Sequence, residues 1–144
     1  MPRIEKAVSS FKGTCNCAQA ILSTYSTQYG LNRDTALKLA TGFGGGMARL
    51  GRTCGAVSAA FMVIGLKYGM GMEGDKEKKE KTYDLIQKFS GQFQEINRSV
   101  ICRELLGCDI NTPEGKKYYS QNNLFEKNCV QYVKNVAEIL EKMI

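Results

Sequence analysis

Apolar residues recur at intervals of three and four along most of the chain, which is the spacing of one face of an α-helix. The longest such run contains Tyr83, Ile86, Phe89, Phe93, Ile96 and Val100. A second run closes the chain with Cys129, Val133, Val136, Leu140 and Met143. No stretch alternates β-branched and polar residues with period two, as a half-buried strand does. The pattern therefore predicts helices and no sheet.

Capping and turn residues divide the first half of this pattern into separate helices. Gly13 ends the first helix, and Thr14 is the predicted N-cap of the second. Gly30 closes the second helix, after which Asn32 is expected to cap a short helix that runs to Thr41. The glycine-rich stretch that follows is interpreted as a loop.

The second half of the chain divides in the same way. A buried helix is predicted from Thr53 to Tyr68, and the long amphipathic helix follows after the turn MGMEGD. The sequence CRELLG adds a short helix that stops at Gly107. Thr112 is the predicted cap of the next helix, and Pro113 is its first residue.

Chain length and composition indicate how these helices are organised. The 144 residues, 43% of them hydrophobic, are enough for one core and too few to favour two domains. We therefore predict a single domain over residues 1–144, folded as an all-α bundle of five to seven helices.

Charge and hydropathy argue against several partners. The net charge of +6 is spread along the chain without a nucleic-acid motif, so no nucleic-acid partner is predicted. The longest nearly apolar stretch, Cys54 to Leu66, is too short for a membrane span, which needs about 20 residues. The first residues lack the apolar run of a secretory signal, so we expect a cytoplasmic protein. Homo-oligomerisation is compatible with the sequence.

Six cysteines and no histidine are the most selective features of the composition. The cysteines lie at positions 15, 17, 54, 102, 108 and 129. In a reducing compartment they should start as thiols, and each alone is as well explained as a small core residue. The absence of histidine removes the usual partner for nucleophilic catalysis and the commonest metal ligand.

The stretch GMARLGRT, residues 46–53, has the glycine spacing of a phosphate-binding loop, with Arg52 where lysine belongs. Such a loop follows a buried strand, whereas the preceding TALKLATGF has a helical pattern. Nucleotide binding is therefore not predicted. We interpret the glycines as a tight turn that brings Cys54 to the first turn of a helix capped by Thr53.

This placement predicts a reactive thiol at Cys54. The amides at a helix N-terminus favour an anion, which would lower a thiol pKa from about 8.5 toward 7. Arg49 and Arg52 are expected to add to the effect. We therefore expect Cys54 to be the most reactive thiol of the chain, with burial as the opposing factor.

The other cysteines are placed where a bundle can gather them. Cys17 is expected three residues after its helix cap, Cys102 near a helix end, and Cys129 on an apolar helix face. We predict that these three and Cys54 converge on one site although they are far apart in the sequence.

The same residues resemble the C_GCAxxG_C_C family, a group of small bacterial proteins described as redox-active. The resemblance rests on the motifs NCAQA, FGGGM, TCGAVSAA and CRELLGCD, with a cysteine in the last helix. The family's four characteristic cysteines correspond to Cys17, Cys54, Cys102 and Cys129. Cys15 and Cys108 are additional, and Ala59 replaces the last glycine of the family motif. The resemblance implies redox activity without specifying a substrate.

Three functions are compatible with these observations. The first is a thiol-based oxidoreductase in which the four family cysteines cycle between dithiol and disulfide, or pass electrons to a partner protein. The second is a metal or iron–sulfur site on the same four cysteines, although no cofactor is predicted from their wide spacing. The third is a noncatalytic helical binding protein whose cysteines only fill the core.

Overall fold

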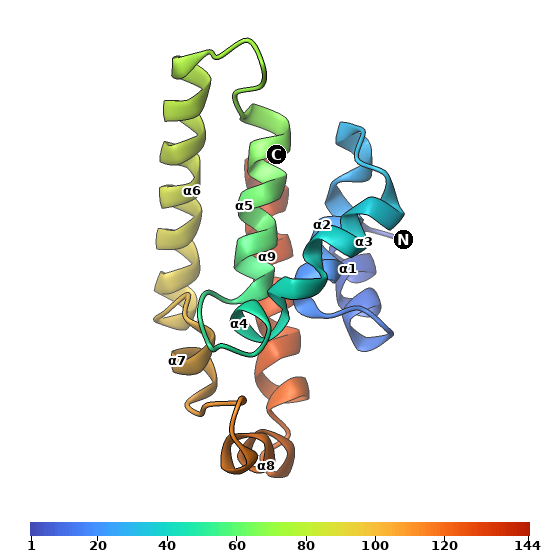
Figure 1. The fold of residues 1–144 in the computed structure, drawn as a ribbon, viewed down its shortest axis with the longest axis vertical. Helices are drawn as coiled ribbons and strands as arrows, with labels where there is room; N and C mark the ends of the chain where they lie inside the picture. The colour runs from blue at the N-terminus through green and yellow to red at the C-terminus, as the bar shows by residue number, and fades with distance from the viewer.

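Two helices rich in small side chains form the centre of the molecule. The computed structural model describes all 144 residues. In it α5 (Gly55–Tyr68) packs between α2 (Cys17–Tyr25) and α6 (Lys76–Asn97), and α9 (Val130–Met143) lies behind α5 (Figure 1). Alanines on α2 and α5 are fully buried, which lets the two helices approach closely.

The remaining elements surround this centre. They are α1 (Arg3–Lys12), η1 (Thr27–Tyr29), α3 (Arg33–Ala40), η2 (Thr41–Phe43), α4 (Gly44–Met47), α7 (Cys102–Leu106), α8 (Pro113–Gln121) and η3 (Phe125–Cys129). There is no β-strand, so the predicted all-α fold is confirmed.

The number of helices exceeds the predicted five to seven. Eight of the elements labelled α1 to α9 are regular helices. The exception is α4, a single turn in which Gly45 and Gly46 lie outside the right-handed helical region. One cause is Arg98, whose φ of 75° ends α6 at Asn97, so the apolar run does not continue as one helix to Val100.

Two of the predicted N-caps are confirmed by their hydrogen bonds. The Asn32 side chain accepts from the Thr35 amide at 3.1 Å, and the Thr112 hydroxyl accepts from the Gly115 amide at 3.0 Å. Pro113 is the first residue of α8, where its missing N–H costs nothing.

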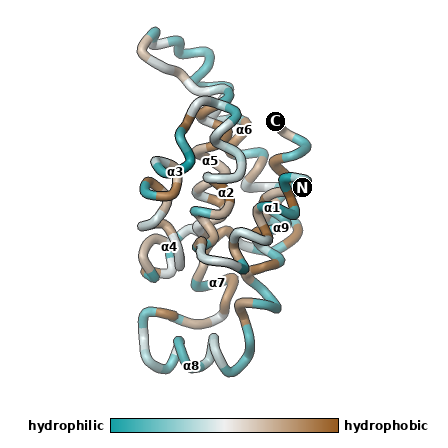
Figure 2. The backbone as a smooth tube through the Cα atoms, turned by 90° about the vertical axis from the view of Figure 1, so that its right-hand side faces the viewer, coloured by the Kyte–Doolittle hydropathy of each residue, from teal (hydrophilic) through white to brown (hydrophobic).

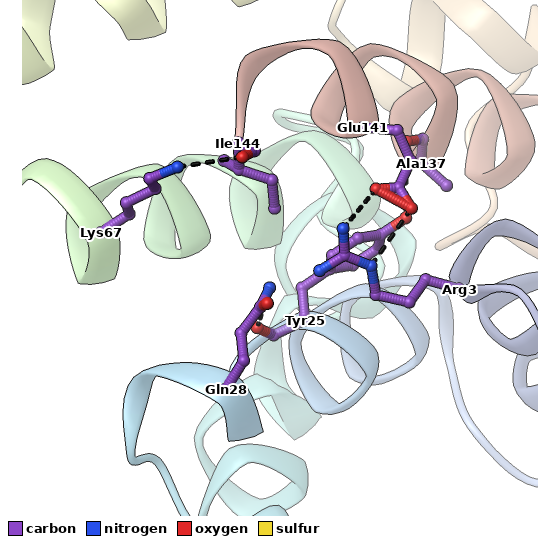
Figure 3. Close-up of polar contacts among 7 residues, drawn as sticks. All are labelled: Arg3, Tyr25, Gln28, Lys67, Ala137, Glu141 and Ile144. Atoms are coloured by element: carbon purple, nitrogen blue, oxygen red, sulfur yellow. Dashed lines mark hydrogen bonds and ion pairs between the residues drawn. The ribbon is translucent and has the colours of Figure 1, made fainter.

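The two ends of the chain are tied together through α1 and α9 (Figure 3). Arg3 donates two hydrogen bonds to Glu141, at 2.6 and 3.1 Å, and its guanidinium lies over the Tyr25 ring. The Tyr25 hydroxyl donates to the Ala137 carbonyl at 3.4 Å. These contacts hold α1, α2 and α9 together away from the cysteines.

Hydropathy follows this arrangement. In Figure 2 the hydrophilic segments are prominent at the two ends of the long axis, around the start of α6 and around α8, while the middle of the molecule is mainly hydrophobic. None of the helices combines the length and the apolar character that crossing a bilayer requires.

Candidate functional site: a cavity lined by cysteines

A cavity of about 800 Å³ is lined by residues of α2, α4, α5, α7, α8, η3 and α9. Of these elements, α4, α7 and α8 lie in the lower half of the molecule as drawn in Figure 1. The cavity wall contains Cys17, Cys54, Cys102 and Cys129, hereafter the cavity cysteines. The four residues predicted to converge therefore line one cavity, although they come from four separate segments. Cys15 also lines the cavity, whereas Cys108 does not line it and packs against the small apolar cluster that contains Cys102.

Cys17 is placed by the start of α2. It is the first residue of the helix, and its N-cap is Asn16 rather than the predicted Thr14. The Asn16 side chain and the Gln19 side chain each accept a hydrogen bond from the other's backbone amide, both at 2.9 Å. Asn16 also donates to the Thr41 carbonyl at 3.0 Å, which attaches this corner to the segment before the glycines.

Cys54 and Cys102 are brought together by a short antiparallel contact between two loops. Thr53 and Ile101 form an isolated bridge, and the residue after each of them is a cavity cysteine. The Cys54 amide donates to the Val100 carbonyl at 2.7 Å. Thr53 is therefore a bridge residue and not the predicted cap. Cys54 is itself the N-cap of α5, one residue before the predicted first turn.

The glycine loop is a left-handed turn. Five consecutive residues, 45–49, have φ between 54° and 67°, and Met47, Ala48 and Arg49 among them are not glycine. Left-handed helical geometry costs an L-residue about 1–2 kcal/mol, so these three store about 3–6 kcal/mol of strain. The stretch interpreted as a tight turn is thus a turn of defined hand, and the helical elements α3 and η2 precede it rather than a strand.

Gly46 explains why this turn contains glycines. A Cβ at Gly46 would lie 2.6 Å from the Cys102 Cβ and 2.6 Å from the Arg52 amide nitrogen. Gly55 is equally restricted, because a Cβ there would lie 2.7 Å from the Cys17 sulfur. Both glycines allow backbone to pack directly against a cavity cysteine.

Cys129 occupies a π-helical segment. It is the last residue of η3, immediately before α9, so the helical register changes at this cysteine. Single π turns inside α-helices occur frequently at functional sites. The Tyr119 hydroxyl, from α8, donates to the Cys129 sulfur at 3.7 Å. Tyr132, one turn further on in α9, donates to the Leu105 carbonyl at 2.9 Å and holds α7 beside it.

Burial dominates the electrostatics of the four thiols. It raises the pKa of Cys102 to about 12 and that of Cys129 to about 11, where the Tyr119 hydrogen bond partly opposes the rise. It also raises the pKa of Cys17, and that of Cys54 well above its ordinary value. All four thiols are therefore protonated at neutral pH.

The expectation of a lowered pKa at Cys54 is wrong. Its thiol is buried, and the amides of Ala56 and Val57 at the start of α5 offset only part of the desolvation. Arg49 and Arg52, expected to stabilise the thiolate, are exposed. Helix-end effects reach about 2 kcal/mol, whereas full burial shifts a pKa by up to 3–5 units.

Two residues that sequence reasoning missed complete the cavity wall. Lys116 and Tyr119 lie three residues apart on one face of α8, and both line the cavity. Their spacing was visible in the sequence, but the periodicity of α8 does not reveal which of its faces meets the cysteines. Cys15, treated as additional, also belongs to the wall because it precedes the Asn16 cap.

The side chains do not form a metal-binding set in these positions. No three cysteine, aspartate, glutamate or histidine side chains lie close enough together to hold a metal ion, and all six cysteines are free thiols. A tetrahedral thiolate site would require the cavity cysteines to move toward one another.

Comparison with known proteins gives one match. A family model described as "Putative redox-active protein (C_GCAxxG_C_C)" matches residues 15–143. This range includes all four cavity cysteines. No curated protein and no solved structure matches the chain.

Proposed function

This chain belongs to the C_GCAxxG_C_C family of redox-active proteins, and on that premise we propose that it is a thiol–disulfide oxidoreductase. The observation that carries the proposal is the convergence of Cys17, Cys54, Cys102 and Cys129 on one cavity. Separate core-filling cysteines would have no reason to share a wall.

The raised pKa values support an exchange between two uncharged states. Two protonated thiols pass two electrons and two protons to the disulfide of a substrate or partner, whose sulfur–sulfur bond breaks to give two thiols while one sulfur–sulfur bond forms in the protein. Neither the dithiol nor the disulfide places a charge in the apolar cavity. Buried surroundings that disfavour thiolates therefore still permit this redox step.

Neighbouring groups favour two pairs. The Cys17 sulfur lies against Gly55, the residue after Cys54, and both of these thiols face the Ala56 amide. Cys17 and Cys54 are therefore proposed as an inner pair.

Cys102 and Cys129 are proposed as an outer pair. Cys129 packs against the small apolar cluster that contains Cys102. Among charged neighbours, ionised Cys129 has the largest effect on the pKa of Cys102, although Cys17 has the largest on that of Cys129. Formation of either disulfide requires the two sulfurs to approach each other, because all six cysteines are free in the described state.

Counting thiols at controlled redox potentials tests the proposal. The protein is equilibrated with dithiothreitol buffers, alkylated, and digested without further reduction for mass spectrometry. We expect the cavity cysteines to become protected in pairs, while Cys15 and Cys108 stay alkylated throughout. A Cys15→Ser/Cys108→Ser variant is the matched control and should behave identically.

Two outcomes would contradict the proposal. If all six thiols stay free in oxidising buffer, the cysteines are core residues and a noncatalytic binding role is the better explanation. If disulfides form only at Cys15 or Cys108, the four cavity cysteines are not the redox centre.

A metal or iron–sulfur site on the cavity cysteines is the second candidate, favoured by four thiols sharing one wall. The described positions fit it less well, because no three ligand side chains are close enough. Metal analysis and an absorption spectrum of protein purified without air decide between the two candidates. Stoichiometric iron or zinc that is lost on substituting any cavity cysteine would favour the second.

A further inference from the structure

All the charged side chains in the cavity wall are positively charged. Arg49 and Lys116 are its only charged side chains, and no aspartate or glutamate lines it. Both side chains belong to exposed residues, so the cavity is open to solvent where they lie. The rest of the wall is mostly apolar.

Neither cation is neutralised within the protein. Arg49 and Lys116 take part in no ion pair, and the side-chain hydrogen bonds donated by arginines and lysines come from other residues. The neighbouring Arg103, by contrast, pairs with Asp109 at 3.3 Å and does not line the cavity. Two free cations at the opening of an apolar cavity select for a negatively charged ligand.

The cations approach the cavity from two different elements. Arg49 is the last residue of the left-handed turn, and Lys116 projects from α8, below α4 in Figure 1. Arg49 has a strained φ of 67°, and residues with such strain cluster at active sites and ligand clamps.

We infer that the substrate is a low-molecular-weight disulfide that carries carboxylates. This inference rests on the proposed function and adds the substrate class. A cavity of about 800 Å³ is within the range of small-molecule sites. A protein disulfide would have to reach thiols that are buried or half-buried below the opening.

The placement of Lys116 indicates which thiol reacts first. Lys116 and Tyr119 share one face of α8, and the Tyr119 hydroxyl contacts the Cys129 sulfur. A carboxylate held by Lys116 therefore leaves the sulfur–sulfur bond of the same small molecule near Cys129. Within the outer pair, only Cys129 has a hydrogen bond that stabilises its thiolate.

The two cysteines of the outer pair are sufficient for the complete reaction with one substrate disulfide. The Cys129 thiol loses its proton and attacks one sulfur of the substrate, whose sulfur–sulfur bond breaks to release one small thiolate, which takes up a proton. Cys102 then attacks the mixed disulfide and releases the second small thiol. Two protein thiols and one substrate disulfide become one protein disulfide and two small thiols.

Three commercial disulfides with the same two-carbon arms test the charge selectivity. They are 3,3′-dithiodipropionate, 2-hydroxyethyl disulfide and cystamine, which carry negative, zero and positive charge. The reduced protein is mixed with each at low salt, and loss of protein thiols is followed over time. We expect the dianion to react about tenfold faster than the neutral probe, and cystamine to react most slowly. Added salt should reduce these differences.

Variants of the two cations assign the selectivity to this cavity. Arg49→Gln and Lys116→Gln should each lower the ratio of the anionic to the neutral rate by at least about threefold. Lys88→Gln, an exposed lysine on α6 without an ion pair, is the matched control and should leave the ratio unchanged.

The outcomes separate the two proposals. Equal rates for the three probes, or ratios unaffected by both cation variants, would overturn the inferred substrate class while leaving thiol–disulfide exchange in place. Failure of all three probes to oxidise the cavity cysteines, under conditions that oxidise free dithiothreitol, would overturn the proposed function itself.

Discussion

The reduction potential of the outer cysteine pair should keep falling with pH well above the range in which ordinary dithiols level off. Burial raises the pKa of Cys102 to about 12 and that of Cys129 to about 11. Below both values, reduction takes up two protons with its two electrons. The potential therefore becomes more negative as pH rises, because protons are consumed.

The size of the effect follows from these pKa values. A tenfold change in equilibrium constant is about 29.6 mV for two electrons, so two protons give about 59 mV per pH unit. Between pH 7 and pH 10 the potential should fall by about 180 mV on this slope. An exposed dithiol with pKa values near 8.5 would follow it for only about half the range and fall by about 90 mV.

The assay equilibrates the Cys15→Ser/Cys108→Ser variant with dithiothreitol buffers of known potential at each pH and counts alkylated thiols. The same variant unfolded in urea is the control, and its slope should break at the ordinary thiol pKa of about 8.5. A break between pH 8 and pH 9 in the folded protein would show that its thiols ionise normally, and the argument from burial would be wrong.

Three further predictions concern the glycine turn, the hydrogen bond to Cys129 and the dependence of stability on pH. Gly46→Ala should lower the free energy of unfolding of the reduced protein, measured in urea, by about 2–5 kcal/mol, because alanine is strained at positive φ and overpacks this position. Gly65→Ala is the control: position 65 has open space around it within a helix, so the substitution should raise the free energy of unfolding by about 0.5–1 kcal/mol. Tyr119→Phe should slow alkylation of Cys129 at pH 9 about three- to tenfold by removing the hydrogen bond to its thiolate, while the exposed Tyr118→Phe should not. The reduced protein should lose at least about 2 kcal/mol of stability from pH 8 to pH 10, because the unfolded thiols ionise first, at up to about 1.36 kcal/mol per pH unit each. An equal loss in the oxidised protein would contradict this explanation.

Local patterns in the sequence were sufficient for most of the helices. Periodic apolar residues located α6 and α9, and the caps Asn32 and Thr112 have simple local chemistry. The cap of α2 was misplaced because Thr14 and Asn16 are both capping residues two positions apart. The reciprocal bonds with Gln19 decide between them.

The convergence of the cysteines was predictable, but their ionisation was not. Whether a helix N-terminus lowers a thiol pKa depends on how deeply it is buried, and burial is a property of the whole fold. Cys54 shows the difference, because the fold buries a thiol that the local sequence places at an accessible helix end.

The left-handed turn had no sequence signal at Met47, Ala48 and Arg49, because none of these residue types favours positive φ. Tertiary contacts impose the conformation. The Arg52 amide donates to the Gly46 carbonyl at 2.9 Å, and this pairing fixes the turn beside Cys102. The π segment ending at Cys129 was likewise invisible, since its residues have ordinary helical character.

Residues 45–49 wind in the opposite hand to every other helix of the molecule. For a D-amino acid the steric preferences are reversed, and this geometry is the relaxed one. In a chain assembled by chemical ligation, D-alanine at position 48 would therefore remove strain of about 1–2 kcal/mol that natural Ala48 carries. The same replacement at Ala60, inside the right-handed α5, would introduce a comparable penalty. Within one protein, the turn that bears Arg49 thus favours D-amino acids, whereas α5, the helix that follows it, favours L-amino acids.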